Sequence, residues 1–461
     1  MALTFAPMKM FVLLLSCWAI VATMHAQPTP RSLTLNEALK LSLANSAQLK
    51  KTRLDREHLE LRFKEGRSAI LPQINAGVGF DYFPVLPTQF LPADLFGGPE
   101  GGYVPATFGQ PWQLAGTVNV QQSLYNESAR RMAPAANTSR ALYDLLSTRA
   151  EEEVIYNTAM VYYQTLQTEQ LLRSVSANLN KLDALQRMAE LQLANGYATP
   201  TDVKRIRVAR TNLETQRQSL DGGIRALHLT LQFLCGIPYE DAIEPTGEMD
   251  NPAADSSRWQ ILTLEPESTT EYRLLQRQLE LNRIQSHSLR GEVMPRLSAY
   301  ALGALQAQRS DANFFDPAKR WYGLAAVGFK LDVPIFDGFR RRHKAGQMAI
   351  EAQKIEEDRR QLEAAKKLEF YQARDQFQGA IRMLHTQEDN VALAREITDK
   401  LMLQYKEGMA PLNDLLNAQT AQAEAETNYW QQVFTYKLAV LKLLKSAGVI
   451  KSSYGVVSKG Y

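Results

Sequence analysis

The sequence predicts a tandem repeat in which a pair of β-strands is followed by a long helical hairpin, so the chain is mainly α-helical with four strands. The first observation is internal similarity. Leu71-Pro72 recurs as Met294-Pro295, 223 residues later, and Gly196 to Asp202 recurs as Gly408 to Asp414, 212 residues later. The second is that each copy holds two alternating segments followed by a long stretch with few helix breakers. Fixed offsets between similar segments indicate a repeated architecture.

The repeats divide the sequence into segments of different character. We assign residues 1–26 to a signal peptide, 27–237 to the first repeat, 238–270 to an equatorial connector, 271–448 to the second repeat and 449–461 to a C-terminal tail. Each repeat is expected to run as helix, strand pair and helical hairpin. The first repeat carries about a dozen extra residues within the Pro- and Gly-rich stretch Pro84–Pro111, where an inserted loop is expected.

The N-terminal segment is typical of a secretory signal. Met10 to Ala22 is a mostly apolar stretch preceded by Lys9, and Ala26 offers a cleavage site. This stretch is shorter than the roughly 20 residues that a membrane-spanning helix needs. We therefore expect export and cleavage near Ala26. Two alternatives stay open: translation could begin at Met8 instead of Met1, and Cys17 could be the lipidated cysteine of a lipoprotein.

Period-two alternation predicts the strands. The expected strands are Ile74 to Tyr82 and Leu114 to Gln121 in the first repeat, and Leu297 to Gln308 and Trp321 to Val333 in the second. Strands of about 10 residues with one apolar face fit a tilted strand that crosses a bilayer and turns its polar face to a lumen. A soluble two-faced sheet has the same alternation, so that alternative stays open.

Aromatic residues favour the membrane interpretation. Trp112, Trp321 and Tyr322 begin the second strand of each repeat, where an interfacial aromatic girdle would lie. Four strands cannot close a membrane barrel, because an open edge in hydrocarbon leaves backbone groups without hydrogen bonds. We therefore expect closure by oligomerisation, and the sequence allows eight or twelve strands.

The helices are predicted to be unusually long. Asn126 to Asn195 and Gly338 to Glu407 could each form one helix, a length that belongs to coiled coils. Gly196 and Gly408 then supply the positive φ that ends a helix, and Pro200 and Pro411 fit the first turn of the next one. Thr199 can cap the first restart with Asp202 three residues on.

Composition and motifs argue against several functional classes. Lys and Arg total 52 against 49 Asp and Glu, a dispersed net charge of +3, so no nucleic-acid partner is expected. The sequence holds no CxxC, P-loop or GxSxG motif, and its histidines lack paired metal-ligand spacing. We expect no enzyme activity, no metal and no cofactor. Once the signal is removed only Cys235 remains, and we expect it to pack as a small hydrophobic residue.

One dense basic run stands out, from Phe339 to Lys344, with Arg130-Arg131 at the matching place in the first repeat. Cations near a helix N-terminus are disfavoured by the helix dipole, so a compensating group is expected. Lipid phosphates or carboxylates of a neighbouring subunit would serve, and a solvated face is the third alternative.

These features together resemble the TolC family of outer-membrane efflux proteins. The resemblance rests on the signal peptide, on Leu33 to Leu39, on the strand starts at Leu71-Pro72 and Met294-Pro295, and on the turns Gly196–Asp202 and Gly408–Gln419. It implies a homotrimer with a twelve-stranded β-barrel in the cell outer membrane and an α-helical tunnel extending into the periplasm. It also implies a passive exit duct of a tripartite efflux or type I secretion system, in contact with outer-membrane lipid, a periplasmic adaptor (membrane fusion protein) and an inner-membrane transporter.

The resemblance further implies a gate at the hairpin tips, formed by Asp202, Tyr405, Asp414 and Asn417. Where the family has an arginine and a second aspartate, this chain has Ala410 and Asn417, so we expect the closed state to rest on packing and on a hydrogen bond from Tyr405 to Asp202. Simple helix capping stays open as the role of both aspartates. The hairpin tips expected to dock an adaptor are Gly196, Tyr197, Gly408 and Met409.

A periplasmic adaptor is the alternative function, because adaptors also contain a long helical hairpin. An adaptor would have one hairpin between flanking β-domains, whereas this sequence predicts two, each after a strand pair. An exported enzyme on a helical framework lacks the expected motifs. The sequence does not indicate whether the cargo is a drug, a metal or a secreted protein.

Overall fold

The computed structural model describes residues 31–247, 249 and 259–455. The predicted signal peptide, with Ala26 and Cys17, lies outside the described residues. The chain divides into two compact units. The sheet unit comprises residues 54–143 and 275–358, and the helical unit comprises the described residues up to 53, 144–274 and from 359 onward.

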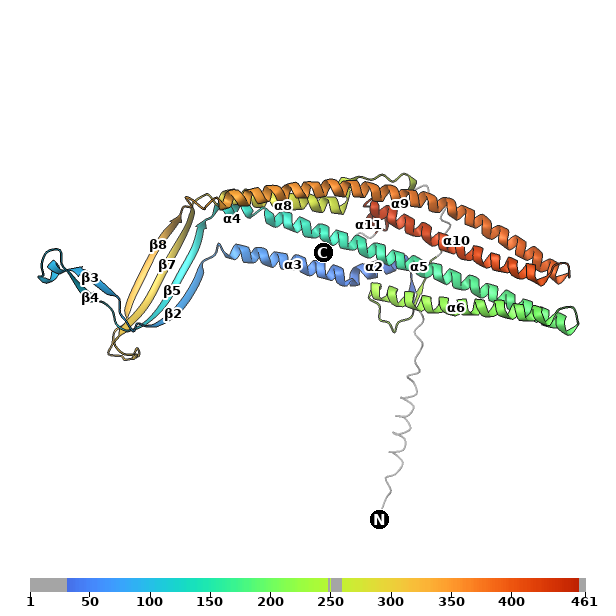
Figure 1. The fold of residues 1–461 in the computed structure, drawn as a ribbon, viewed down its shortest axis with the longest axis horizontal. Coiled ribbons are helices and arrows are strands. Elements are labelled where there is room, and N and C mark those ends of the chain that lie inside the picture. The colour runs from blue at the N-terminus through green and yellow to red at the C-terminus, as the bar shows by residue number, and fades with distance from the viewer. Residues whose placement is uncertain (1–30, 248, 250–258, 456–461) are drawn as a thin grey trace, which may run out of the picture. The chain divides into compact units, whose positions relative to one another are not determined.

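The sheet unit is built on four long antiparallel strands in the order β2-β5-β7-β8 (Figure 1). These are β2 (Gln73–Tyr82), β5 (Trp112–Tyr125), β7 (Arg296–Arg309) and β8 (Tyr322–Asp332). The four strands predicted from alternation are therefore confirmed, β5 being longer than expected. The unit also includes α4 (Glu127–Met132) and most of α3 (Ala47–Ser68) and α8 (Thr270–Gly291).

The inserted stretch of the first repeat is more ordered than the predicted loop. It forms a β-hairpin of β3 (Thr88–Pro92) and β4 (Tyr103–Thr107), joined through a short 3-10 helix η1 (Ala93–Phe96). Gly97 follows this helix with φ of 77°, a conformation that glycine adopts without the strain of a side chain. The insertion is ordered by backbone hydrogen bonds between two strands, which the alternation of apolar and polar residues did not reveal.

Strand register sorts the sheet into two chemically different faces. Directly paired residues share a face of a sheet. The pairs Val78↔Gly116, Gly116↔Leu305 and Leu305↔Gly323 belong to one face, on which every residue is apolar except Gln122 and Arg309, near the ends of β5 and β7. Across β2, β5, β7 and β8 this apolar face comprises Ile74, Ala76, Val78, Phe80, Tyr82, Trp112, Leu114, Gly116, Val118, Val120, Leu297, Ala299, Ala301, Gly303, Leu305, Ala307, Gly323, Ala325, Val327, Phe329 and Leu331.

The opposite face of the sheet is largely polar. It carries Asn75, Asp81, Thr117, Asn119 and Gln121 on the first two strands, and Ser298, Gln306, Gln308, Lys330 and Asp332 on the last two. No layer covers the apolar face within the described chain: Val78 is 80% exposed and Val327 is 84% exposed. A water-soluble sheet would bury such a face against a core.

The helical unit contains most of two helical hairpins, whose first helices begin within the residues of the sheet unit (Figure 1). The first is α5 (Ala135–Ala194) with α6 (Pro200–Cys235), and the second is α9 (Arg340–Lys406) with α10 (Leu412–Ser446). The single helix expected from Asn126 is interrupted between α4 and α5, next to Pro134, which lacks an amide hydrogen. In α9 the glycines at 346 and 379 do not interrupt the helix.

Shorter elements complete the helical unit. They are β1 (Arg31–Leu33), which pairs in parallel with β6 (Ile243–Pro245), together with α2 (Leu35–Asn45), the 3-10 helix η2 (Pro266–Ser268) and α11 (Ile450–Ser453). The Tyr162 hydroxyl lies 3.0 Å from the Leu33 carbonyl oxygen and 2.8 Å from that of Thr246. This contact ties the small β1-β6 sheet to α5.

The main apolar core lies in the helical unit and joins both hairpins. Its largest fully buried side chains include Tyr162 of α5, Phe377 of α9 and Tyr436 of α10, and the rings of Phe377 and Tyr436 are 5.8 Å apart. Cys235 is fully buried in the same core, which confirms its expected role as a small hydrophobic residue. Burial raises the pKa of its thiol to about 11.

Among the described residues, no helix is both long enough and apolar enough to cross a membrane.

Gly236 provides a test of how α6 ends. Its φ is +67°, and an added Cβ would lie 2.6 Å from the Cβ of Asn45. The left-handed conformation alone costs an alanine about 1–2 kcal/mol. We therefore expect Gly236→Ala to lower the midpoint of thermal unfolding followed by circular dichroism. Gly223→Ala is the matched control, because this glycine lies within α6 with open space around it. An unchanged midpoint for Gly236→Ala would contradict this packing.

Candidate functional site

The tips of the two hairpins share one backbone geometry. Gly196 has φ of 79° and Gly408 has φ of 73°, and each follows the end of a long helix. In the first turn the amide of Tyr197 donates to the carbonyl of Gln192 at 2.8 Å, and the second turn repeats this bond at the same distance. This six-to-one bond with a left-handed glycine is typical of a Schellman motif. The repeat therefore extends to individual hydrogen bonds at the tips.

The helices that restart after the two turns are capped differently. The carboxylate of Asp202 accepts hydrogen bonds from the amide of Thr199 at 3.1 Å and from its hydroxyl at 2.7 Å, and the amide of Asp202 donates back to that hydroxyl. These bonds lower the pKa of Asp202. Pro411 is itself the N-cap of α10 without a side-chain bond, so its expected place in the first helical turn was wrong.

Tyr405 does not make the hydrogen bond that the sequence suggested. Its hydroxyl donates to Oε1 of Gln192 on α5 at 3.0 Å, not to Asp202, because the Asp202 carboxylate is engaged in capping α6. Tyr405 is only 8% exposed. Burial, and then the nearby charge of Asp202, raise the pKa of its phenol. The contact still joins the second hairpin to the first.

An apolar cluster surrounds Tyr405, and we call it the tip core. It brings together buried side chains from all four hairpin helices, namely Leu182, Leu185, Ala189, Val203, Ile206, Tyr405, Leu412 and Leu415. Leu415 and Ile206 are fully buried. Apolar burial is therefore the main force that keeps the two tips together, and the Tyr405–Gln192 hydrogen bond sets their register.

A second polar contact joins the hairpins farther from the tips. The Ser174 hydroxyl on α5 donates to the carboxylate of Glu426 on α10. The same carboxylate accepts hydrogen bonds from Gln422 at 3.0 Å and from the Arg395 guanidinium at 3.1 and 3.2 Å. Burial opposes the charge of Glu426, but the bonds from Ser174, Gln422 and Arg395 prevail and lower its pKa.

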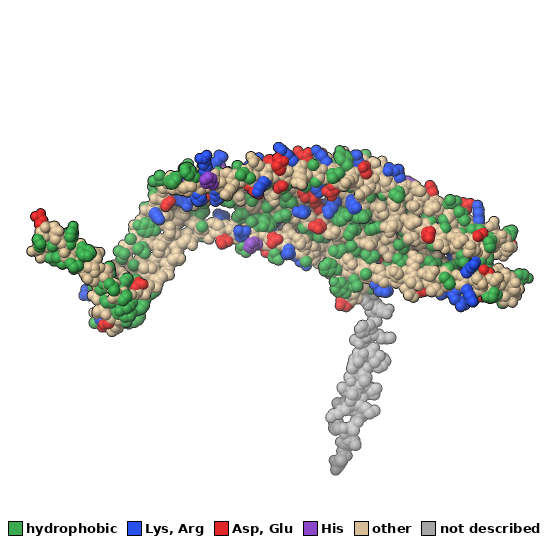
Figure 2. Space-filling model, in the orientation of Figure 1, with side chains coloured by type: hydrophobic (Ala, Val, Ile, Leu, Met, Phe, Trp, Pro, Cys, Tyr) green, Lys and Arg blue, Asp and Glu red, His purple; other side chains and the backbone are tan. Residues whose placement is uncertain are grey.

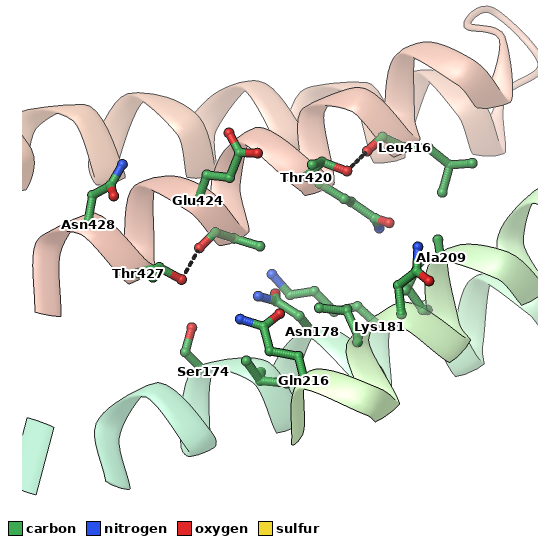
Figure 3. A pocket seen from close by; sticks show the side chains of 16 residues that line it. Ser174, Asn178, Lys181, Ala209, Gln216, Leu416, Thr420, Glu424, Thr427 and Asn428 are labelled. Atoms are coloured by element: carbon green, nitrogen blue, oxygen red, sulfur yellow. Dashed lines mark hydrogen bonds between the residues drawn. The ribbon is translucent and has the colours of Figure 1, made fainter. Parts of the chain in front are cut away.

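A groove of about 540 Å³ runs between these two contacts, with α5 and α6 on one side and α10 on the other (Figure 3). Its polar lining comprises Ser174, Asn178, Lys181, Asn212, Gln216, Gln419, Thr420, Glu424, Thr427 and Asn428. The amide nitrogen and oxygen of Gln419 are both buried and lack a hydrogen-bond partner in the described chain. A buried amide of this kind calls for water or an added partner.

The remaining predicted site residues lie in two places. Asp414 and Asn417 are exposed in the first turns of α10. At the tips, Tyr197 is 86% exposed and Met409 is 72% exposed. The aromatic residues proposed as a girdle lie in the sheet unit, at the end of the sheet where β8 begins. There the Trp112 ring is 4.3 Å from that of Tyr82, Tyr322 is 63% exposed, and Trp321 precedes β8.

Sequence reasoning missed the partners that connect the hairpins. Gln192, Ser174 and Glu426 belong to no recognisable motif, and their contacts join residues 213 and 252 positions apart. Only the predicted length of this helix, which belongs to coiled coils, hinted that it packs along another helix. Within the described residues no group of three or more His, Cys, Asp or Glu could hold a metal ion.

Comparisons with known proteins agree on one family. A sequence profile described as Outer membrane efflux protein matches residues 275–449. Outer membrane protein TolC of Salmonella enteritidis is 20% identical over 423 residues, covering 88% of this chain and 80% of the relative. Outer membrane protein TolC of Escherichia coli strain K12 is 20% identical over 429 residues, with the same shares covered.

Solved structures support the fold. CusC has a TM-score of 0.70 at 14% identity, with 90% of this chain and 92% of that chain covered. VceC from Vibrio cholerae has a TM-score of 0.68 at 16% identity, with 90% of this chain and 96% of that chain covered. The predicted strand pairs and helical hairpins are thus an architecture that known proteins share.

The Tyr405 contact can be tested without disturbing the tip core. Tyr405→Phe keeps the buried ring and removes the hydrogen bond to Gln192, a bond worth about 0.5–1.5 kcal/mol. We expect amide hydrogen exchange in residues 185–197 and 400–412 to rise by about two- to tenfold. Tyr197→Phe is the control, since this exposed tyrosine makes no side-chain hydrogen bond in the described chain. Equal exchange in both variants would contradict a role for Tyr405 in joining the tips.

The Glu426 contact predicts a pH dependence. Because the folded-state pKa of Glu426 is lowered, the carboxylate stabilises the fold above about pH 4.3, the usual glutamate pKa, and this contribution is lost as the pH falls through the folded value. At pH 7 the parent should therefore melt at a higher temperature than Glu426→Gln, and the difference should shrink below about pH 4. The exposed Glu424→Gln change on the same helix serves as the control. A difference independent of pH would refute this assignment.

Proposed function

We propose that the chain is an efflux channel of the cell outer membrane that belongs to the outer membrane efflux protein family, and that three copies form one passive exit duct, gated at the hairpin tips. The single observation that carries the proposal is the register of the four-stranded sheet. It gathers apolar side chains on one face and polar side chains on the other.

The apolar face suits contact with lipid. Most of its side chains are exposed or partly exposed, including Val78 on β2 and Val327 and Phe329 on β8, whereas Ala307 near the end of β7 is buried. The polar face carries Asn119, Thr117 and other groups that water in a lumen would solvate. Strands that alternate between lipid and lumen have this composition.

The free edges of the sheet support the oligomer. β2 and β8 each pair on one side only. Unpaired amide and carbonyl groups at such edges cannot be left in hydrocarbon, so each edge strand requires a strand from another copy. Three copies of this sheet give twelve strands, in agreement with the trimer that the resemblance implies.

The hairpin tips form the gate of the proposed duct. The tip core and the Tyr405–Gln192 bond hold the two hairpins of one chain together, and Asp414 and Asn417 lie exposed beside them. Opening would separate these contacts. Because Ala410 supplies no guanidinium at this turn, the closed state depends on packing and neutral hydrogen bonds.

The partners follow from the same surface. We assign adaptor docking to the two turns, where Tyr197 and Met409 present large side chains to solvent, and an inner-membrane transporter would supply energy that the duct does not. A periplasmic adaptor is not favoured as the identity of this chain, because the chain has two hairpins and a bare four-stranded sheet.

A matched pair of substitutions on β8 tests the proposal. Val327 lies at the centre of the strand on the apolar face, and Leu324 lies on the opposite face and is 56% exposed. An arginine facing the middle of a bilayer costs about 2–4 kcal/mol, whereas one facing the lumen is tolerated. We expect Val327→Arg to reduce the amount of protein recovered in outer membranes severalfold, and Leu324→Arg to insert and change single-channel conductance in planar bilayers.

The opposing outcome is equally clear. Both side chains are exposed in a single chain, so a water-soluble sheet would accept both substitutions alike. Equal membrane recovery of the two variants, with conductance unchanged in Leu324→Arg, would overturn the lipid-facing assignment and the proposed duct with it.

A further inference from the structure

The four junctions between helices and sheet share a chemical pattern that the channel function does not by itself require. They lie at one end of the sheet, because the start of β2 pairs near the end of β5, and the start of β7 pairs with the end of β8. Each junction exposes large apolar side chains, namely Ile70 and Leu71, Leu124 and Tyr125, Val293 and Met294, and Ile335, Phe336 and Phe339.

Cations accompany the apolar side chains at every junction. We define the junction collar as those apolar residues together with Arg67, Arg130, Arg290, Arg340, Arg342 and Lys344, all of which lie on or next to the adjoining helices. Figure 2 shows hydrophobic side chains at the end of β8 and lysine and arginine side chains beside them at the start of α9. Apolar groups next to cations are the pattern of a surface lying in a membrane interface.

The β8–α9 junction is the most developed part of the collar. Phe339 is the one non-glycine residue with a positive φ among the described residues, at 64°. Its ring meets that of Phe336 edge to face at 5.5 Å, yet Phe339 is 57% exposed and Phe336 is 73% exposed. A strained backbone that presents two aromatic rings to the outside indicates selection for what those rings contact.

The carboxylates of this junction already form ion pairs with cations of the same junction. Asp337 pairs with Arg341 at 2.6 Å, and Glu292 pairs with Arg340 at 2.8 Å and with Lys344 at 3.9 Å. Against these two carboxylates stand Arg340, Arg341, Arg342 and Lys344, which leaves two positive charges.

Among Arg340, Arg341, Arg342 and Lys344, Arg342 is the cation without a partner in the described chain. It is exposed and makes no side-chain hydrogen bond or ion pair within the described chain, while Arg340 and Lys344 on either side keep side chains 58% and 46% exposed. A smaller excess, of one positive charge, occurs at the β5–α4 junction. There Glu127, 3% exposed, binds both Arg130 and Arg131, and the Arg130 side chain stays 74% exposed.

We propose that the junction collar binds anionic phospholipid of the membrane leaflet at this end of the sheet, with its apolar side chains among the acyl chains and Arg342, Arg340, Lys344 and Arg130 on the headgroup phosphates. The inference rests on the proposed function, because only a membrane-inserted sheet brings the collar to a headgroup layer. Charge complementarity selects the occupant: the collar has an excess of cations, and the positive end of the α9 dipole adds to it. Carboxylates of a second copy are the competing occupant.

The test uses the purified full-length protein, delipidated in detergent and titrated with phosphatidylglycerol or phosphatidylethanolamine, with bound lipid counted by native mass spectrometry. A lysine or arginine near an anionic surface strengthens binding by about fivefold. We expect the parent to prefer phosphatidylglycerol, and Arg342→Gln to weaken phosphatidylglycerol binding by about that factor. Inorganic phosphate at equal concentration should not compete, because it lacks the acyl chains.

Two further variants separate the parts of the collar. Arg382→Gln removes an exposed arginine of the same helix α9 within the helical unit, so it should bind lipid as the parent does. Phe336→Ser with Phe339→Gly removes both rings and relieves the positive φ at position 339. This double variant should weaken both lipids alike, because acyl chains do not distinguish headgroups.

Equal binding of the two lipids by the parent, or equal loss in Arg342→Gln and Arg382→Gln, would overturn the collar. Dissociation of the oligomer in Arg342→Gln, with lipid preference unchanged in the remaining assemblies, would assign Arg342 to a second copy instead. A protein that conducts in bilayers but shows no lipid preference would refute the collar alone. A protein that neither inserts nor conducts would refute the proposed function and the collar together.

Discussion

The two unpaired edges of the four-stranded sheet are the constraint on which the rest of the structure depends. β2 and β8 leave a row of backbone donors and acceptors open, and the apolar face beside them has no covering layer in the described chain. In hydrocarbon the open edges would leave backbone groups without hydrogen bonds, and in water the uncovered apolar face would be exposed at a cost in free energy. In a membrane, further copies of the chain would pair the open edges, and lipid would cover the apolar face. The polar opposite face then has water as its natural neighbour.

The helical unit meets a different requirement, because in the proposed duct its two hairpins must pack together when closed and separate from each other at the tips when open. Its main core around Tyr162, Phe377 and Tyr436 is large and apolar. Toward the tips the apolar contacts between hairpins become fewer, and polar features accompany the small tip core: Ser174 to Glu426, the groove lined by Gln419, and Tyr405 to Gln192. Regions with less apolar burial open at lower free energy than the core. The structure therefore concentrates its weakest packing where a duct would need to open.

Most of the fold could be predicted from the sequence, because period-two alternation and long uninterrupted helices are local signals. The four strands, the two hairpins and the turns at Gly196 and Gly408 were found in this way. The β3–β4 hairpin was missed because its pairing depends on backbone contacts without a strong side-chain pattern. The Tyr405 partner was assigned to Asp202, but the capping box of Thr199 engages that carboxylate. Gln192 and Glu426 could not be found, since only tertiary packing brings them to their partners.

The central claim is that the sheet is closed by copies of itself. Native mass spectrometry of the complex released gently from detergent micelles measures this most directly, because it counts chains in one particle. The account predicts three copies and hence twelve strands, with four from each chain. A stable particle of one chain would contradict it, because the edges of β2 and β8 would then have no partner strand in the membrane.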